Sequence, residues 1–302
     1  MIYTNKIKTD LRSREILPGS FSENLFTCIR CALDRYSNNT LPWHWHDTFE
    51  IDYILQGELE IRSTDSSLKL KQGDTVFINQ GVMHEYQGMG ETPCVLIAIL
   101  FDFHLLSGVY NSLIEQKYIL PMKENGPGLF AFSPDSPRRI EMAQAVNNAI
   151  ELCRGGRSGY EMLLRSELSF FWLGLLEETK DLRRSEGVTV VDQERIKKML
   201  AYIHTNYAGR VTVEEVAAAA DVSVRECTRC FSKVIGMPPV KYLSEYSVHK
   251  AAEMLLESDA SVLDISLECG FSSSSYFGKS FSAVMGCTPG EYRRGKGSRK
   301  TV

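Results

Sequence analysis

The chain shows two kinds of hydrophobic periodicity, and the change between them separates a strand-rich front from a helical remainder. Between about 20 and 104, apolar and polar residues alternate, as in FEIDYILQGELEIR, and polar turn signals such as STDSS interrupt the pattern. One face of that segment carries Phe49, Ile51, Tyr53 and Leu55. The run CVLIAILF predicts a buried strand. Short strands at this spacing are typical of an antiparallel sandwich or barrel.

From about 135 the apolar spacing becomes helical and predicts two amphipathic helices separated by glycines at 155, 156 and 159. The stripe of the first helix is Ile140, Ala143, Val146 and Ile150. The second has a wide apolar face, made of Leu163, Leu164, Leu168, Phe171, Trp172, Leu175 and Leu176. This face either packs only on its own domain or also forms a dimer interface, because one neighbour covers it poorly. We assign 135–180 to dimerisation.

The stretch 181–190 is polar and aperiodic, which predicts a linker, and 191–302 is helical in pattern. The latter contains a repeat. FSKVIGMPPVKY at 231–242 matches FSAVMGCTPGEY at 281–292 at an offset of 50, and 216–223 matches 265–272 at an offset of 49. Two copies of one supersecondary unit explain this most simply.

Helix-start signals give each copy the form of a helix-turn-helix. Thr212 with Glu215, and Ser223 with Glu226, have capping-box spacing. The short helix between them and the tight turn lead to a second helix, as in DNA readers. In the second copy, Gly270 stands where the turn requires a positive φ.

The second helix of each copy is the candidate recognition helix. Cys227, Cys230, Phe231 and Val234 form the predicted inner face of the first, and Tyr276, Phe277, Phe281 and Val284 that of the second. Basic and hydroxyl side chains can bind phosphates and base edges. The predicted DNA-binding residues are Ser223, Arg225, Glu226, Thr228, Arg229, Ser273, Ser274, Ser275 and Lys279. The alternative is that these residues only form solvated helix faces. The presence of two such helices in tandem units makes that explanation weaker.

These two stretches resemble the halves of the AraC/XylS-type DNA-binding domain. The match is most specific in ISLECGFSSSSYFGKSFSAVMGCTPGEYRR. The resemblance implies a long helix between the two units, for which 241–256 is suited, and recognition helices in successive major grooves. The chain departs from the family pattern at Ser247, where arginine is usual, and at Ser266, where alanine is usual. The serines at 272–275 leave the second helix poor in long polar side chains.

The front segment resembles the two cupin motifs. PWHWHDTFEIDYILQG supplies His44, His46 and Glu50, and GDTVFINQGVMH supplies His84. The resemblance implies a cupin β-barrel over 1–134 together with an N-terminal arm. Histidines two apart on a strand point to the same face, so His44 and His46 would project together.

Two kinds of ligand suit such a cluster. His44, His46, Glu50 and His84 would hold zinc, iron, manganese or nickel. AraC-type regulators with a front cupin commonly bind a small effector there, often a sugar. The candidate effector-binding residues are Trp43, His44, His46, Glu50 and His84, since imidazoles, a carboxylate and indoles can bond and stack on a polar ring. The cluster could also be only a satisfied polar core.

Composition narrows the class of protein. Of 302 residues, 43% are hydrophobic and 24% charged, which excludes a largely disordered chain. No apolar run is long enough for a membrane span, and no signal peptide is recognisable, so we expect a cytoplasmic protein with reduced thiols. The net charge of −4 is uneven, because 192–302 carries 15 basic and 13 acidic residues. The pairs Cys28–Cys31 and Cys227–Cys230 are expected to pack in the core.

The sequence therefore predicts a two-domain α+β protein, with a cupin sensor, a helical dimerisation segment and an all-α tandem helix-turn-helix domain. The predicted function is a transcription regulator without enzymatic activity, whose effector biases operator binding. Its predicted partners are double-stranded DNA, a small molecule and a second copy of the chain, with RNA polymerase as a further partner of such a regulator. The alternative is a cupin metalloenzyme with an appended DNA-binding domain.

Overall fold

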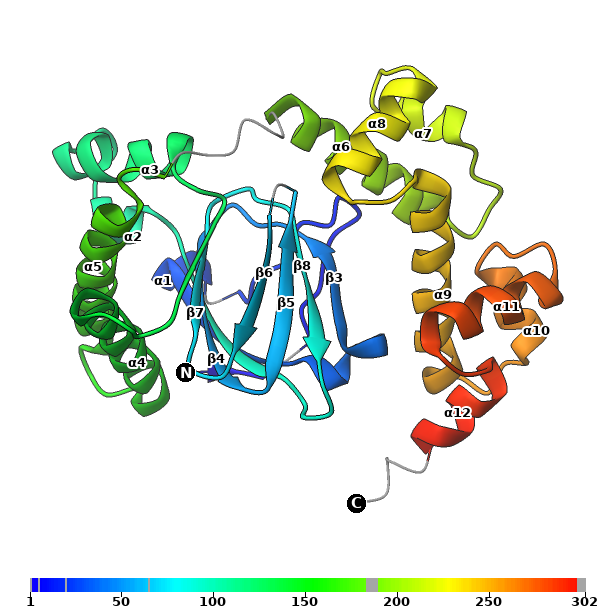
Figure 1. The fold of residues 1–302 in the computed structure, drawn as a ribbon, viewed down its shortest axis with the longest axis horizontal. Coiled ribbons are helices and arrows are strands. Elements are labelled where there is room, and N and C mark those ends of the chain that lie inside the picture. Colours follow the sequence, from blue (N-terminus) through cyan, green and yellow to red (C-terminus); the bar gives the residue numbers. More distant parts are fainter. Residues whose placement is uncertain (1, 5, 20, 65, 183–189, 298–302) are drawn as a thin grey trace. The chain divides into compact units, whose positions relative to one another are not determined.

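The fold comprises two structural units (Figure 1), seen in a computed structural model that describes all residues except 1, 5, 20, 65, 183–189 and 298–302. The first unit is Met1–Asp10 with Arg14–Gly187, and the second is Leu11–Ser13 with Val188–Val302. Strands lie in the first unit and the helix-turn-helix region in the second.

The described strands of the first unit pair as two sheets. They are β1 (Ile2–Tyr3), β2 (Phe26–Ala32), β3 (Thr40–His44), β4 (Phe49–Gln56), β5 (Glu58–Ser63), β6 (Ser67–Lys71), β7 (Thr75–Ile78), β8 (His84–Met89), β9 (Val95–Phe101) and β10 (Leu129–Phe132). The larger sheet has the order β1-β2-β9-β4-β7-β10 and the smaller β3-β8-β5-β6. The fold class is confirmed, but the sheets do not close into one barrel, because no strand pairing in the described chain joins their edges.

The alternation in β4 places its residues in two different cores. Phe49 and Ile51 pack with Phe171 and Trp172, on the side of the large sheet that helices cover. The intervening residues of β4 face the smaller sheet, and among them Ile54 packs with Leu59 and Ile61. The polar residues of β4 therefore point into the space between the two sheets, where the candidate site lies.

The helices of the first unit flank the large sheet. They are α1 (Phe21–Asn24), α2 (His104–Ser107), α3 (Leu120–Asn125), α4 (Pro137–Gly155) and α5 (Tyr160–Thr179), with short turns η1 (Leu33–Arg35), η2 (Ser37–Asn39) and η3 (Glu115–Ile119). Gly156 and Gly159, with φ of 56° and 80°, stand between α4 and α5, as the sequence predicts. Ala143, Val146 and Ile150 are buried, but the prediction for Ile140 is wrong, because it is 52% exposed in the first turn of α4.

The cysteines behave as core residues. Cys28 lies in the helix-side core and Cys31 in the core between the sheets, because residues three apart on β2 face opposite ways. Cys227 and Cys230 are fully buried on one side of a helix. All eight cysteines are described as free thiols.

The second unit is helical throughout its described part. Its helices are α6 (Val190–Asn206), α7 (Val213–Ala219), α8 (Val224–Val234), α9 (Pro239–Glu257), α10 (Val262–Glu268), α11 (Ser274–Met285) and α12 (Pro289–Gly297). The long helix α9 joins the α7–α8 and α10–α11 pairs, as the resemblance implies. Most of the predicted linker at 181–190 lies outside the described residues.

The predicted caps form with one exception. Thr212 and Glu215 make the full capping box at the start of α7. Ser223 accepts a hydrogen bond from the Glu226 N–H at 3.2 Å, but the Glu226 carboxylate does not return it. That carboxylate is bonded to Arg229 and Arg195 instead, so the second capping box is only half formed.

The turns of the two copies share a left-handed residue but not its surroundings. Asp221 has φ of 55° and Gly270, its counterpart at offset 49, has φ of 81°. A Cβ on Gly270 would lie 2.3 Å from the backbone oxygen of Tyr207. Glycine is therefore required in the second turn by close contact as well as by φ.

Candidate effector site and nucleic-acid interface

The four residues of the cupin-like motifs meet between the two sheets. His44 ends β3 and lies opposite His84, the first residue of β8. Glu50 comes from β4 in the other sheet, and His46 follows β3. All four are at most 2% exposed. The sequence prediction that they come together is therefore correct in its geometry.

The backbone orients the three imidazoles in the same way. Nδ1 of His44 lies 2.9 Å from Pro42 O, Nδ1 of His46 3.0 Å from Thr48 O, and Nδ1 of His84 2.9 Å from Val82 O. A carbonyl oxygen can only accept, so each Nδ1 must donate. Neither His44 Nε2 nor His84 Nε2 has a hydrogen-bond partner in the described structure, and in the neutral ring of His44 this leaves the Nε2 lone pair as an acceptor.

A buried ion pair occupies the centre of the cluster. His46 Nε2 lies 2.7 Å from Glu50 Oε2, and His84 Nε2 is 3.4 Å from the same oxygen without hydrogen-bond geometry. Burial opposes charge on His46, but the Glu50 carboxylate outweighs it and raises the pKa of His46. Burial likewise opposes charge on Glu50, and the neighbouring His46 outweighs it and lowers the pKa of Glu50. Burial, followed by the charge of His84, lowers the pKa of His44.

Three buried side chains that sequence reasoning missed extend the cluster. Glu15 is 6% exposed, and its N–H donates to Trp45 O at 2.8 Å. Burial raises the pKa of Glu15 to about 8. The charge of His46 acts to lower this pKa, and the charge of Glu50 acts to raise it. On the inner side, Tyr86 Oη donates to Asp52 Oδ2 at 2.5 Å. Asp52 was detectable as the residue two after Glu50, whereas nothing local marks Glu15.

The two tryptophans are placed differently from the histidines. Trp43 and Trp45 are buried, at 5% and 9% exposure. The pairing of β3 with β8 shifts register between Leu41 and His44, so regular alternation does not fix the face on which Trp43 lies. The Arg14 guanidinium lies 5.8 Å from the Trp45 ring centre. The structure thus brings His44, His46, Glu50 and His84 together, and it leaves stacking by the tryptophans as a prediction.

The outer face of α8 is polar, and its inner face is the predicted one. Cys227, Cys230, Phe231 and Val234 are buried. Exposed residues include Ser223, Arg225 and Thr228. Arg229 is also exposed, but its Nε and Nη2 bond to Glu226 at 2.8 and 2.7 Å. Among the described residues, Arg225 has no such ion pair and is the long basic side chain of this face that is ready to meet a ligand.

Helix α11 repeats this design with smaller side chains. Ser273, Ser274, Ser275 and Lys279 are exposed, and Phe277 and Phe281 are buried. The assignment of Tyr276 to the inner face is wrong, because it is 53% exposed and its ring lies tilted against that of Phe271. The phenol therefore lies beside the serines, where it adds a long polar group to that face.

Comparison with known proteins connects both units to one family. The family described as AraC-like ligand binding domain matches residues 28–171, and the helix-turn-helix domain family matches residues 216–295. The chain belongs to the AraC family. It is therefore a DNA-binding transcription regulator with an N-terminal ligand-binding domain.

Relatives of this AraC-family chain are similar along most of their length. The uncharacterized HTH-type transcriptional regulator YdeC of Bacillus subtilis is 27% identical over 94% of this chain and 97% of its own. The melibiose operon regulatory protein of Escherichia coli is 24% identical over 83% of each chain. Among solved structures, ToxT of Vibrio cholerae is matched over 89% of this chain and 97% of its own, with 12% identity and a TM-score of 0.43.

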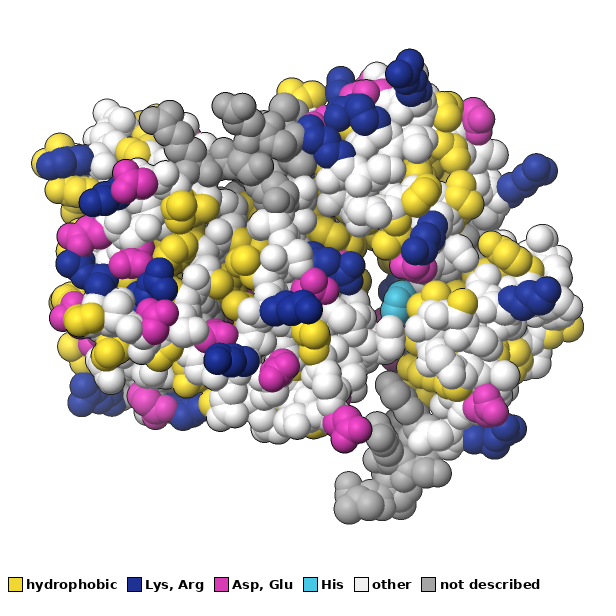
Figure 2. All heavy atoms as spheres, in the orientation of Figure 1, with side chains coloured by type: hydrophobic (Ala, Val, Ile, Leu, Met, Phe, Trp, Pro, Cys, Tyr) yellow, Lys and Arg dark blue, Asp and Glu magenta, His cyan; other side chains and the backbone are white. Residues whose placement is uncertain are grey.

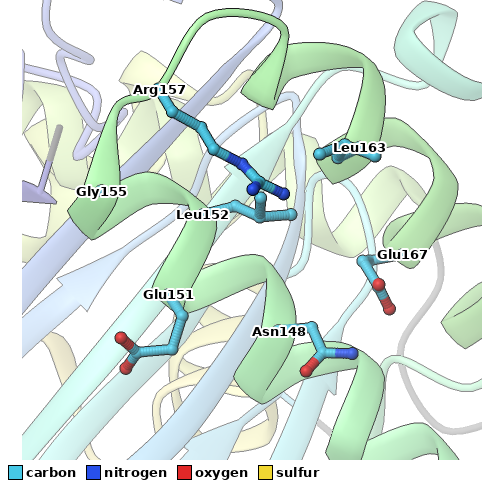
Figure 3. Close-up of a pocket in the computed structure, with 7 residues that line it drawn as sticks. All are labelled: Asn148, Glu151, Leu152, Gly155, Arg157, Leu163 and Glu167. Atoms are coloured by element: carbon cyan, nitrogen blue, oxygen red, sulfur yellow. The ribbon is translucent and has the colours of Figure 1, made fainter.

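The helix pair of the AraC-like ligand-binding domain also carries an open hollow (Figure 3). Asn148, Glu151 and Leu152 line it from α4, and Leu163 and Glu167 line it from α5, with the Arg157 side chain extending over Leu152. On α5, Met162, Phe170 and Leu173 are 77%, 52% and 54% exposed. None of the described helices is both long and apolar enough to cross a membrane.

Proposed function

We propose that this AraC-family protein is a cytoplasmic regulator that reads operator DNA with α8 and α11 and is controlled by a small polar effector bound between the sheets. The observation that carries the proposal is the repeated α7–α8 and α10–α11 pair, whose second helices expose polar faces over buried aromatic ones. A footprint of the full chain on the DNA upstream of its own gene, with and without candidate effectors, tests both parts.

The proposed DNA contacts are divided between the two helices. Base reading is assigned to Ser223, Arg225 and Thr228 on α8, and to Ser273, Ser274, Ser275 and Lys279 on α11. Glu226 and Arg229 form the edge of the first face, where their mutual ion pair reduces the charge that they present. The serine-rich second face favours phosphate contacts and recognition of DNA shape over bidentate base reading.

The proposed effector is a sugar or a similar polar metabolite. The cluster offers the unpartnered Nε2 of His44 and the carboxyl groups of Glu50 and Asp52 between two apolar layers, a composition that suits a hydroxyl-rich ligand. The name of the melibiose operon relative supports the same class of ligand. Because the cluster is buried, an effector can reach it only if the segments around it move.

A divalent metal is a second candidate ligand, favoured by the orientation of the imidazoles. Ligand atoms of His46, Glu50 and His84 lie within 4.8 Å of one another, and the ring centroids of His44 and His84 are 4.2 Å apart. Nδ1 donation to backbone carbonyls is the usual outer support of metal-binding histidines. When bound, the metal would supply a fixed positive charge for anchoring effector oxygens.

Metal binding is tested by equilibrium dialysis of the full chain against Zn²⁺, followed by metal analysis. We expect about one ion per chain and, at a hundredfold excess over Kd, a stabilisation of about 2.7 kcal/mol. His84→Ala should lose the ion, because it removes one of three close ligands, and His104→Ala, outside the cluster, should keep it. Equal retention by both variants, or none by the wild type, would exclude the site.

Dimerisation is proposed through the exposed apolar stripe of α5. Met162, Phe170 and Leu173 repeat at helical spacing on one side of α5, and unpaired stripes of this kind favour burial against a second copy. RNA polymerase remains a proposed second macromolecular partner of the promoter-bound form.

Phe170→Glu is expected to convert the dimer to a monomer, because a charge at the centre of an apolar interface costs at least about 2 kcal/mol. Light scattering after size exclusion measures the mass. Leu113→Glu makes a similar change at an exposed residue outside α5 and should leave the mass unchanged. A wild-type chain that is already monomeric at micromolar concentration would contradict the proposal.

A further inference from the structure

A buried carboxylate holds two basic side chains of the first recognition helix. Asp192, in the first turn of α6, is 3% exposed. Its Oδ1 lies 2.6 Å from Arg229 Nη2, and its Oδ2 lies 2.9 Å from Lys233 Nζ. Each oxygen therefore binds a different cation, and the two cations stand one turn apart on α8.

A second acid completes the capture of Arg229. Glu226 accepts from Arg229 and, at 2.8 Å, from Arg195 Nη1. Figure 2 shows acidic and basic side chains intermixed over the region of α6 and α8. The side chains of Arg229 and Lys233 are 45% and 32% exposed, so an outside anion can reach both cations.

The duplicated unit provides an internal comparison. At an offset of 50, Arg229 corresponds to Lys279, Lys233 to Ala283 and Glu226 to Tyr276. In the described structure Lys279 is exposed and forms no ion pair. The captured cations are thus a feature of the first recognition helix and not of the helix-turn-helix design as such.

We propose that Asp192 is a positioning residue that competes with DNA phosphates for Arg229 and Lys233 and thereby limits binding to DNA of unrelated sequence. Contacts between basic side chains and phosphates supply nearly all of the sequence-independent affinity for DNA. A basic side chain that is bound to a carboxylate does not contribute such a contact. Arg225 is not bound to a carboxylate in this way, and its proposed role in base reading is unchanged. The inference rests on the proposed contact of α8 with DNA.

The position of Asp192 also connects it to the rest of the chain. It is the third residue of α6, the first described helix after the segment that joins the two units.

The test is the salt dependence of binding to a short duplex of scrambled sequence, measured by fluorescence anisotropy on the full chain. For Asp192→Asn we expect tighter binding at low salt and a plot of log K against log salt that is steeper by about 0.9, because Lys233 is released while Glu226 still holds Arg229. Asp259→Asn makes the same change at an exposed position and should keep the wild-type slope. A folded Asp192→Asn variant with the wild-type slope would overturn the proposal.

Lys233→Gln keeps the carboxylate in place and serves if the asparagine variant does not fold. A captured Lys233 makes no phosphate contact, so the wild-type slope should persist, and a slope shallower by about one would overturn the proposal. Arg225→Ala separates this inference from the function on which it rests. Unchanged operator affinity in Arg225→Ala would remove α8 from the interface, whereas weakened affinity with an unaltered Asp192→Asn slope would refute the role of Asp192 alone.

Discussion

Arg225→Ala is expected to lower operator affinity by about one to two orders of magnitude. A good bidentate contact to a base is worth about 1–3 kcal/mol, and every 1.4 kcal/mol is tenfold in Kd. Arg225 is the long basic side chain on the outer face of α8 that the described structure leaves without an ion pair. The measurement is a titration, at fixed salt, of the fragment that the wild-type chain protects.

The matched control is Arg35→Ala, because Arg35 is also an exposed arginine but lies in the sensor unit. It should bind the operator like the wild type. The loss in Arg225→Ala should be largest on the operator and small on scrambled DNA, since a base contact carries sequence information and a phosphate contact does not. An equal loss on both duplexes would reassign Arg225 to the phosphate backbone, and no loss would take α8 off the DNA.

His46→Ala is expected to abolish the response to effector. His46 is the charged partner of Glu50, and removing one member of a buried ion pair costs about 3–5 kcal/mol because the other charge is left uncompensated. The substitution therefore destroys the polar arrangement that the effector would bind. The measurement is operator occupancy against the concentration of a sugar that stabilises the wild-type chain in a thermal-shift panel.

Because His46→Ala also weakens the sensor fold, His46→Gln provides the sharper version. Glutamine can still donate a hydrogen bond to Glu50 but carries no charge. We expect a folded chain with a strongly reduced response, and His104→Ala, at a part-exposed histidine outside the cluster, should respond normally. A normal induction curve in His46→Gln would remove this imidazole from the effector site.

Local patterns predicted those parts of the molecule that depend on neighbouring residues in the chain. Alternation in β4 gave the two faces of the strand, and the spacing of Thr212 and Glu215 gave a true capping box. The meeting of His44, His46 and Glu50 with His84 is instead what the resemblance to the cupin motifs implies. For β4 and the capping box, local periodicity is enough to decide where the side chains point.

Contacts between segments that are distant in the sequence could not be predicted from local periodicity. The buried Glu15 comes from a segment with no strand pattern, and Asp192 binds Arg229 from 37 positions away. The hydrogen bond from Glu15 N–H to Trp45 O and the ion pair of Asp192 with Arg229 both depend on which segments pack together, and periodicity does not specify that. The same limit explains Tyr276, whose apolar ring predicts burial while the path of α11 over Phe271 leaves its outer half in solvent.

The turn at Gly270 has a consequence for how the two halves of the duplication can diverge. At 221 the chain already tolerates a side chain, so substitutions there are limited only by backbone preference. At 270 the Tyr207 oxygen forbids even a methyl group. The two halves of the duplication therefore accept different substitutions. The turn at 221 can carry a side chain, whereas the turn at 270 must stay glycine as long as the Tyr207 backbone packs against it.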